Sequence, residues 1–258
     1  MRLFQSVLFA VLLLSGSLAG CLSNTENGNG IELEVHYTQT NGTIVQSYID
    51  GGLVSTNNVV LNFDFSRTIS ENRLVEFGID LMDGSNPVTV IPDEHEDISI
   101  EFSAHGFYPL QAYASDEMGN TEIVSIVVRI ELRIDWMESK TYEPTPLVID
   151  PIPSNGGSSP NTIHINSTVE NPELIQSIET GREVEFTWSL VDENEDACQS
   201  RDGLVHEGDF ANWETIHFNT FQVHELRISY DSGQDHINVN HSVLIAYDAN
   251  ESSPNHSH

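Results

Sequence analysis

One short stretch of the chain spaces side-chain oxygens as a calcium-binding loop does. Asp192, Asn194 and Asp196 occupy alternating positions, from which their oxygens can converge on a hard cation. The pattern then stops, because Ala197 stands where such a loop turns on glycine and Gly203 stands where a bidentate glutamate would complete it. Charged runs are usually solvated. The sequence therefore favours a solvated acidic loop, with calcium as the one cofactor that it suggests.

No catalytic signature accompanies these acids. His95, His206 and His224 each begin a His-Glu pair, but the fifth residue of each segment is not histidine, which excludes a zinc-protease helix. The chain has no Gly-x-Ser-x-Gly turn, no phosphate-binding glycine loop and no Cys-x-x-Cys pair. With 40 Asp and Glu residues, neighbouring acids carry no information on glycoside hydrolysis. We therefore expect a protein that is not an enzyme.

The N-terminus has the layout of an export signal. Arg2 is followed by an apolar run over residues 3–14. As a helix this run would be about 18 Å long, well short of the hydrocarbon core of roughly 30 Å that a spanning helix crosses. A basic residue, a short apolar run and then small residues are typical of a secretory signal peptide, here residues 1–20.

The signal ends in Leu18-Ala19-Gly20-Cys21, with small residues directly before the cysteine. This motif resembles the lipobox of prokaryotic lipoproteins, in which the cysteine is lipidated at sulfur and becomes the first residue of the mature chain. The resemblance implies lipidation of Cys21 and a location on the extracytoplasmic face of the cell membrane. An ordinary signal peptide cut near Ala19 and an uncleaved N-terminal anchor are the alternatives. Residues 21–30 lack apolar content and are expected to form a flexible tether.

The charge of the chain limits its partners. Lys and Arg number 9 and Asp and Glu number 40, which gives a formal net charge of −31 at pH 7. No basic stripe is available to neutralise phosphates, so nucleic acid is excluded as a partner. The chain is also not expected to lie flat on an anionic membrane. The acids are scattered, which favours a solvated, self-repelling surface suited to a saline exterior over a cation-binding surface.

Cysteine and asparagine give two further expectations for an exported chain. Once Cys21 is lipidated, Cys198 has no partner within the chain. It is expected as a free, partly buried thiol, with an intermolecular bridge as the weaker alternative. Asn-X-Ser/Thr sequences are acceptors of N-linked glycans. The glycosylation candidates are Asn41, Asn166, Asn240, Asn250 and Asn255.

Alternation of apolar and polar residues dominates the rest of the chain and predicts strands. The clearest runs lie at 31–37, 59–65, 124–136, 183–191 and 236–247, separated by turn sequences such as Asp-Gly-Gly and Asp-Gly. No segment has the pattern of a long amphipathic helix. Short strands with such turns favour an all-β sandwich.

A change in composition divides the strands into two sets. Residues 139–162 hold five prolines and two adjacent glycines, which is typical of a linker, although Leu-Val-Ile near its middle has the pattern of a strand of the next domain. The expected fold class is all-β, with two immunoglobulin-like β-sandwich domains in tandem at 31–138 and 163–248. Residues 249–258 are polar and are expected to be a disordered tail.

The two sets of strands look related to each other. The segment FGIDLMDG at 77–84 aligns with FTWSLVDE at 186–193, which matches their phenylalanines, leucines and aspartates. A later segment at 110–120 is similar to residues 225–234, with a looser match. These matches predict that the second half repeats the first.

In the first set, residues 79–84 read IDLMDG, and residues 106–119 combine Gly-Phe-Tyr with alternating apolar positions before a final Asp and Gly. These segments resemble a PKD-type domain, an immunoglobulin-like family whose central motif reads like W-D-F-G-D-G. Here Ile79 replaces the tryptophan and Met82 replaces a glycine. The resemblance implies a β-sandwich in which the Tyr108 hydroxyl returns to the backbone at a strand corner.

Together these features predict a membrane-anchored, non-catalytic module for binding, adhesion or spacing, with a protein or a glycan at the cell surface as partner. The choice of partner is an analogy at the level of the fold. Trp188 is expected in the core, and Trp213 is the preferred exposed aromatic residue. One alternative is an accessory subunit of a membrane transporter or envelope enzyme, which should expose an apolar patch, for example along residues 123–137. The other is a calcium- or carbohydrate-binding module.

Overall fold

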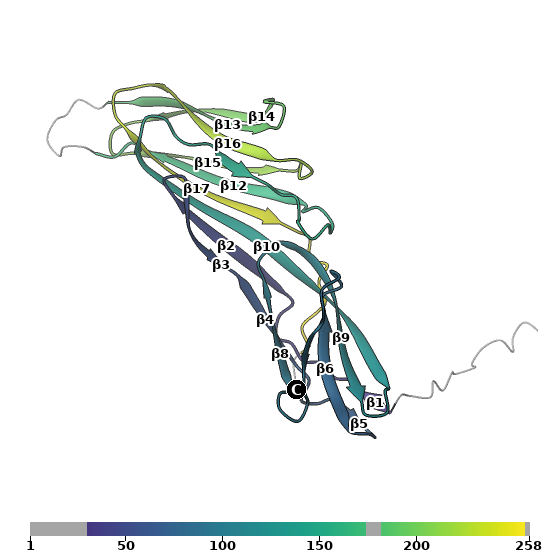
Figure 1. Ribbon diagram of the computed structural model, residues 1–258. Coiled ribbons are helices and arrows are strands. Elements are labelled where there is room, and N and C mark those ends of the chain that lie inside the picture. The colour runs from purple at the N-terminus through teal and green to yellow at the C-terminus, as the bar shows by residue number, and fades with distance from the viewer. Residues whose placement is uncertain (1–29, 174–181, 256–258) are drawn as a thin grey trace, which may run out of the picture.

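Alternating residues form strands along most of the chain, and the all-β fold class is confirmed (Figure 1). The structure is a computed structural model that describes residues 30–173 and 182–255, and these residues form strands without any helix. The signal peptide, most of the tether and the lipidation candidate Cys21 lie outside the described residues. Among the described residues, no helix has the length and apolar character needed to cross a membrane.

The described strands form two halves that are joined by one long strand, β10 (Thr121–Thr141). The strands of the first half are β1 (Ile31–Glu32), β2 (Asn41–Ile49), β3 (Gly52–Asn57), β4 (Val59–Asp64), β5 (Ile69–Ser70), β6 (Leu74–Asp80), β7 (Val88–Val90), β8 (Asp97–Phe102) and β9 (Gly106–Asp116). Those of the second half are β11 (Leu147–Ile149), β12 (Thr162–Glu170), β13 (Val184–Asp192), β14 (Ala197–Val205), β15 (Phe210–His217), β16 (His224–Ser232) and β17 (Ile237–Ala246).

Two layers of strands enclose the core of the first half. β4 pairs with β8 in one layer, and β6 pairs with both β7 and β9 in the other, always antiparallel. Because successive side chains of a strand alternate in direction, each layer turns one apolar face toward the other. Phe65, just after β4, stacks on Phe77 of β6 with ring centroids 4.9 Å apart. Phe63 and Ile79 are fully buried beside them.

The second half repeats this pairing scheme. β12 pairs with β15, and β13 pairs with both β14 and β16, so equivalent pairs form in the same chain order as in the first half. Phe186 and Trp188 of β13 are buried, as are Phe77 and Ile79 of β6. The relation between the halves that the sequence indicates is thus matched by their topology. The predicted core position of Trp188 is confirmed.

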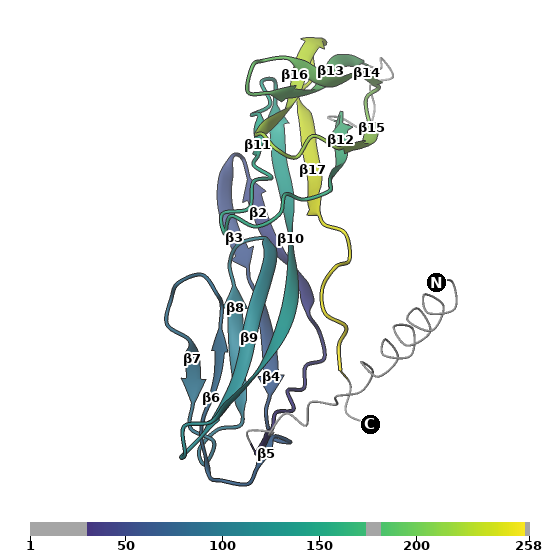
Figure 2. The same cartoon turned by 90° about the vertical axis from the view of Figure 1, so that its right-hand side faces the viewer.

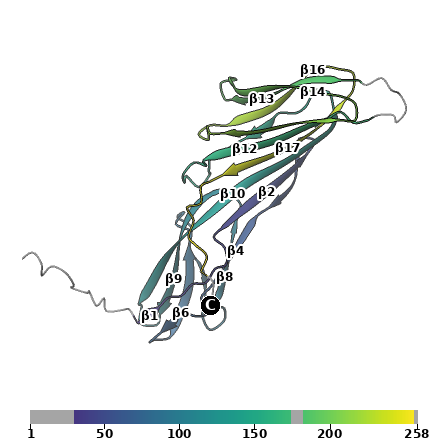
Figure 3. The same ribbon diagram turned by 180° about the vertical axis from the view of Figure 1, so that it is seen from behind.

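β10 runs through both halves (Figure 2). Its first part pairs with β9, and its later part pairs with β17 on one side and, in parallel, with β2 on the other. Figure 3 shows β12, β17, β10 and β2 side by side in the resulting sheet of nine strands, which extends from one half into the other. The linker expected at 139–162 therefore begins inside β10. Its Leu-Val-Ile segment, β11, pairs with β16 as its apolar pattern indicates.

Residues 249–255 are not the disordered tail that their polarity predicts, because they lie along the first half (Figure 2). The Glu251 carboxylate accepts two hydrogen bonds from the Arg129 guanidinium, at 2.8 and 2.9 Å. Ser252 bonds twice to the backbone of Val127, through its own N–H and its hydroxyl, each at 2.9 Å. Polar side chains order this segment because they satisfy backbone groups along an edge of β10.

Candidate functional site

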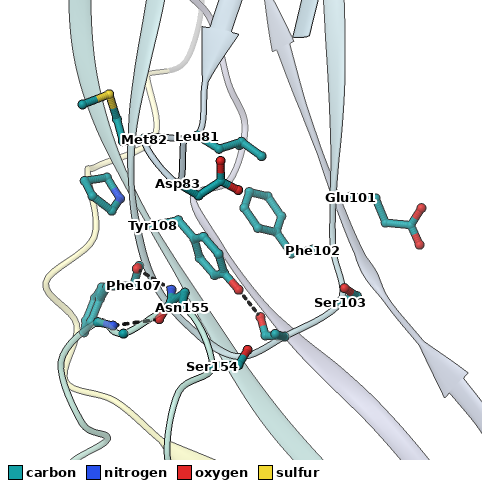
Figure 4. A pocket seen from close by; sticks show the side chains of 14 residues that line it. Leu81, Met82, Asp83, Glu101, Phe102, Ser103, Phe107, Tyr108, Ser154 and Asn155 are labelled. Carbon is teal, nitrogen blue, oxygen red and sulfur yellow. Dashed lines mark hydrogen bonds between the residues drawn. The ribbon is translucent and has the colours of Figure 1, made fainter. Parts of the chain in front are cut away.

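A pocket with a volume of 670 Å³ opens at one end of the first half, where the chain from β11 to β12 crosses it (Figure 4). Three segments that are distant in sequence form its walls. Its lining residues are Leu81, Met82, Asp83, Glu101, Phe102, Ser103, Ala104, Phe107, Tyr108, Pro109, Ser154, Asn155, Gly156 and Gly157.

The β6–β7 connection supplies the first wall. Asp80 and Asp83 each accept a backbone N–H two residues further on, at 2.8 Å, so two tight turns follow one another. Met82 between them has a φ of 56°. This left-handed conformation favours glycine, the residue that the PKD-like motif has at this position. Hydrogen bonds from Ser85 hold the pKa of Asp83 below its usual value, so this carboxylate is charged.

The β8–β9 connection supplies the second wall. The Tyr108 hydroxyl donates a hydrogen bond to the Ala104 carbonyl at 2.6 Å, which confirms the corner position implied by the family resemblance (Figure 4). The Tyr108 ring meets Phe102 edge-on, with centroids 4.8 Å apart. Burial and the nearby charge of Asp83 raise the pKa of Tyr108, so this phenol stays neutral.

Residues 154–157 supply the third wall. The Asn155 side chain donates to the Phe107 carbonyl and accepts the Gly157 N–H, each at 2.9 Å (Figure 4). Gly106 has a φ of 146°, and a Cβ there would lie 2.7 Å from the Asn155 side chain, so only glycine permits this close approach. Sequence reasoning assigns 154–157 to a linker and misses the pocket. The paired glycines after Asn155 were the available signal.

The lining groups are suited to holding a neutral, polar molecule. Asp83 and Glu101 offer carboxylate oxygens, Ser103 and Ser154 offer exposed hydroxyls, and Phe107 offers a half-buried ring. The volume is in the range of small-molecule sites. Neither histidine nor cysteine lines the pocket, so the nucleophile–base pairs of acyl transfer are absent from its lining.

The acidic turn of the calcium hypothesis lies elsewhere, between β13 and β14. The Asp192 carboxylate accepts the N–H groups of Asn194 and Asp196 at 2.8 and 3.1 Å and the Gln222 side chain at 3.2 Å. The backbone hydrogen bonds from Asn194 and Asp196 lower the pKa of Asp192. Both of these bonds go to Oδ1 of the carboxylate. Calcium binding by this turn stays a prediction.

The glycosylation candidates differ in their surroundings. Asn166 and Asn250 are exposed, and Asn240 is half-buried. The Asn41 amide donates to the carboxylate of the C-terminal segment at 2.8 Å, and the Asn255 amide bonds to two backbone groups of the first half. Glycans at Asn41 and Asn255 would break these hydrogen bonds, so Asn166 and Asn250 are the better acceptors. Glycosylation itself stays a prediction.

Two expectations about single side chains are wrong. Trp213, the preferred exposed aromatic residue, occupies an inward position of β15 and packs on Trp188 with ring centroids 6.0 Å apart. The alternation of β15 places this ring inside because its neighbours on both sides turn outward. Cys198 is exposed rather than partly buried. Among the described residues, exposed aromatic side chains of this half include Tyr142, Phe210, Phe218 and Phe221.

Comparisons with known proteins give weak similarities. No family model matches the chain, and no curated protein matches it. Among solved structures, a carbohydrate-binding module of the β-sandwich superfamily is similar at 9% identity, with 85% of this chain and 97% of that chain covered and a TM-score of 0.31. A β-glucuronidase of Bacteroides uniformis is similar at 10% identity over 83% of this chain and 30% of that chain, with a TM-score of 0.28. The SGBP-B protein of the Bacteroides ovatus mixed-linkage glucan utilization locus, in complex with a heptasaccharide, is similar at 10% identity over 78% and 52%, with a TM-score of 0.20. At these identities and TM-scores, none of the similarities bears on what this chain binds.

Proposed function

We propose that this chain is a non-catalytic binding module on the extracytoplasmic face of a membrane, anchored through lipid at Cys21. Its ligand is a neutral polar molecule, such as a sugar unit of a surface glycan, held in the pocket of the first half. The observation that carries this proposal is the pocket itself, in which an aromatic ring, hydroxyls and carboxylates converge.

The lining chemistry suits a sugar and disfavours an anionic ligand. Carboxylates and carbonyls accept hydrogen bonds from sugar hydroxyls, whereas Ser103, Ser154 and Asn155 can donate to them. A half-buried ring such as Phe107 offers an apolar surface for the C–H face of a sugar. The charge of Asp83, together with the net charge of the chain, repels anionic ligands.

The accessory-subunit alternative has less support. It requires a contiguous exposed apolar patch, for which residues 123–137 were the candidate. Within β10 the exposed apolar side chains are Ile123 and Val124 at one end and Met137 at the other, and the positions between them alternate with buried ones. β10 therefore does not present the continuous apolar face that this alternative needs.

The pocket is tested with a substitution that fills it without breaking a hydrogen bond within the protein. Ser154→Trp places a large ring in the pocket, and Ser158→Trp places the same ring on an exposed residue outside the lining. Titration of the full chain with neutral oligosaccharides should show binding for the parent and for Ser158→Trp, and at least a tenfold loss for Ser154→Trp, about 1.4 kcal/mol. Equal binding by both variants, or no glycan bound by the parent, would overturn the pocket assignment.

The anchor has its own test. In cells that process lipoproteins, the parent should fractionate with membranes and Cys21→Ser should be released, because the lipid supplies the membrane affinity. A Cys21→Ser chain that stays in the membrane fraction would contradict the anchor and leave the pocket result untouched.

A further inference from the structure

Three side chains of the second half form a cluster that has no part in the pocket. Cys198 lies at the start of β14, His217 at the end of β15 and His224 at the start of β16. One ligand atom of each lies within 4.8 Å of those of the other two. The β13–β14 and β15–β16 connections beside them correspond to the two connections that line the pocket in the first half.

Both imidazoles of this cluster are buried and incompletely bonded. His217 is 8% exposed and His224 is 1% exposed. His224 donates from Nε2 to the Asn219 carbonyl at 2.8 Å, because a carbonyl can only accept. In the neutral ring this leaves Nδ1 as the nitrogen with a free lone pair. Neither His224 Nδ1 nor His217 Nε2 has a hydrogen-bond partner. Buried polar atoms are nearly always bonded, so two free nitrogens in one cluster indicate a missing ligand.

The loop between the two histidines holds them in place. The Thr220 hydroxyl donates to the Pro160 carbonyl at 2.6 Å, and the Val223 N–H donates to the Glu193 carboxylate at 3.2 Å. The two imidazoles meet edge-to-face, with ring centroids 4.6 Å apart. A site whose ligands are already positioned costs less entropy to assemble.

The charges around the cluster favour a cation. The carboxylates of Asp192 and Asp196 lie close enough to act electrostatically on the Cys198 thiol. A metal ion that displaces the thiol proton would create a thiolate and neutralise it at once.

We propose that Cys198, His217 and His224 bind a divalent transition-metal ion of the zinc class. Thiolate sulfur and imidazole nitrogen are its usual ligands, at about 2.3 and 2.0–2.1 Å, and three protein ligands leave a fourth position for water. Tetrahedral coordination at these bond lengths sets the sulfur and the two nitrogens about 3.3–3.6 Å apart. The ligand atoms lie within 4.8 Å of one another, so the cluster closes by at most about 1.5 Å. Rotation of the exposed Cys198 side chain supplies this movement. Calcium does not fit here, since it takes oxygen ligands.

The test is metal titration of the full chain after treatment with a chelator. Zn²⁺ should bind with one ion per chain, measured by calorimetry. Co²⁺, used as a spectroscopic probe, should give tetrahedral d–d bands and a thiolate-to-cobalt charge-transfer band. Cys198→Ser removes only the sulfur at an exposed position, so the chain should still fold. This variant should bind Zn²⁺ more than about tenfold more weakly and lack the charge-transfer band.

Two matched variants control for the other thiol and for surface histidine. Cys21→Ser and His206→Gln, an exposed histidine outside the cluster, should bind Zn²⁺ as the parent does. The histidines at the C-terminus are present in every variant and cannot account for a difference. Equal Zn²⁺ affinity of the parent and Cys198→Ser, or a Co²⁺ spectrum without a sulfur band, would overturn the site. Either result would leave the glycan pocket of the other half untested and intact.

Discussion

Two equivalent pairs of connections between strands form different kinds of site in the two halves of this molecule. In the first half, the β6–β7 and β8–β9 connections form two walls of an open pocket. In the second half, the segments around β13–β14 and β15–β16 bring one thiol and two imidazoles together. Asp83 and Asp192 hold the corresponding turns alike, each accepting the backbone N–H two residues further on at 2.8 Å.

The difference arises in the second connection of each half. Residues 103–105 cross directly from β8 to β9 and leave a hollow beside them, which residues 154–157 close on one side. Residues 218–223 are a longer connection that folds back to the acidic turn through Gln222 and Asp192. The paired strands are thus arranged alike in both halves. The length of the connection between two strands decides which side chains come together at the end of each half.

The cores of the halves also differ, and the largest predicted effect lies there. In β4 the buried positions hold Leu61 and Phe63, whereas the equivalent strand β12 buries Ser167. Its hydroxyl accepts from Trp188 Nε1 at 2.7 Å and bonds to His241 Nδ1 at 2.9 Å. Ser167→Ala leaves two buried groups without partners, at about 1–3 kcal/mol each, so the free energy of unfolding should fall by about 2–6 kcal/mol.

Denaturant unfolding measures this loss. The exposed Ser158→Ala is the control and should change the free energy of unfolding by less than about 0.5 kcal/mol. A loss below about 1 kcal/mol for Ser167→Ala would show that the core of the second half does not depend on its polar bridge.

A second prediction compares one glycine in each half. A Cβ on Gly203 would lie 2.4 Å from the Phe186 ring and 2.9 Å from Trp188, whereas a Cβ on Gly78 would lie 2.2 Å from the Tyr113 ring. Phe186 and Trp188 are enclosed in the core, but Tyr113 is half-buried and can swing outward. Gly203→Ala should therefore cost about 1–3 kcal/mol of stability, and Gly78→Ala less.

Thermal unfolding of the two alanine variants decides this comparison, since 1 kcal/mol shifts Tm by about 2–4 °C in a chain of this size. Equal shifts for both variants would mean that the two aromatic rings are held with equal rigidity, contrary to their burial.

The third prediction concerns the response of the second core to acid. Burial lowers the pKa of His241 to about 3, below the value of about 6.5 in an unfolded chain. Between pH 6.5 and pH 3, roughly, the unfolded chain therefore binds a proton at His241 that the folded chain does not bind. The free energy of unfolding falls as the pH falls from about 6.5. One proton corresponds to about 1.4 kcal/mol per pH unit, so about 1–2 kcal/mol should be lost between about pH 6.5 and 5.

This dependence is measured as the free energy of unfolding of the parent and of His241→Gln at several pH values. The variant lacks the titrating group, so its curve should be flatter over the same range. Parallel curves would show that His241 does not titrate as its burial requires.

The smallest effect is expected from calcium. The Asp192 carboxylate already accepts hydrogen bonds from Asn194, Asp196 and Gln222, with which a cation would have to compete. Millimolar Ca²⁺ should leave Tm unchanged, whereas Zn²⁺ should raise it by binding only the folded chain. A rise in Tm with Ca²⁺ that is lost in Asp192→Asn would instead establish the acidic turn as a calcium site.

The sequence predicts what depends on local pattern. Alternation predicts a strand at 124–136 that is found at 121–141, and the Gly-Phe-Tyr segment leads to the Tyr108 corner. The repeat is visible because Phe77 and Phe186 fill equivalent core positions. These features follow from the period of a strand and from the burial of one of its faces.

What the sequence does not predict depends on which strands become neighbours. In the sequence, Cys198 is a lone thiol and His224 begins a His-Glu pair without the second histidine of a zinc protease. Only the pairing of β13 with β14 and β16 places these two residues beside His217. Likewise, Glu251 lies in a segment whose polarity predicts a disordered tail, and only its contact with Arg129 shows that the segment is ordered. Proximity across long loops depends on register, which alternation alone does not fix.

The independence of the two sites is tested most directly by titrating the same three chains with two ligands. The parent, Ser154→Trp and Cys198→Ser are each titrated with Zn²⁺ and with the neutral oligosaccharide that the parent binds. Ser154→Trp should lose the oligosaccharide and keep Zn²⁺, and Cys198→Ser should lose Zn²⁺ and keep the oligosaccharide. A variant that loses both ligands, or variants that lose neither, would contradict the assignment of one binding site to each half.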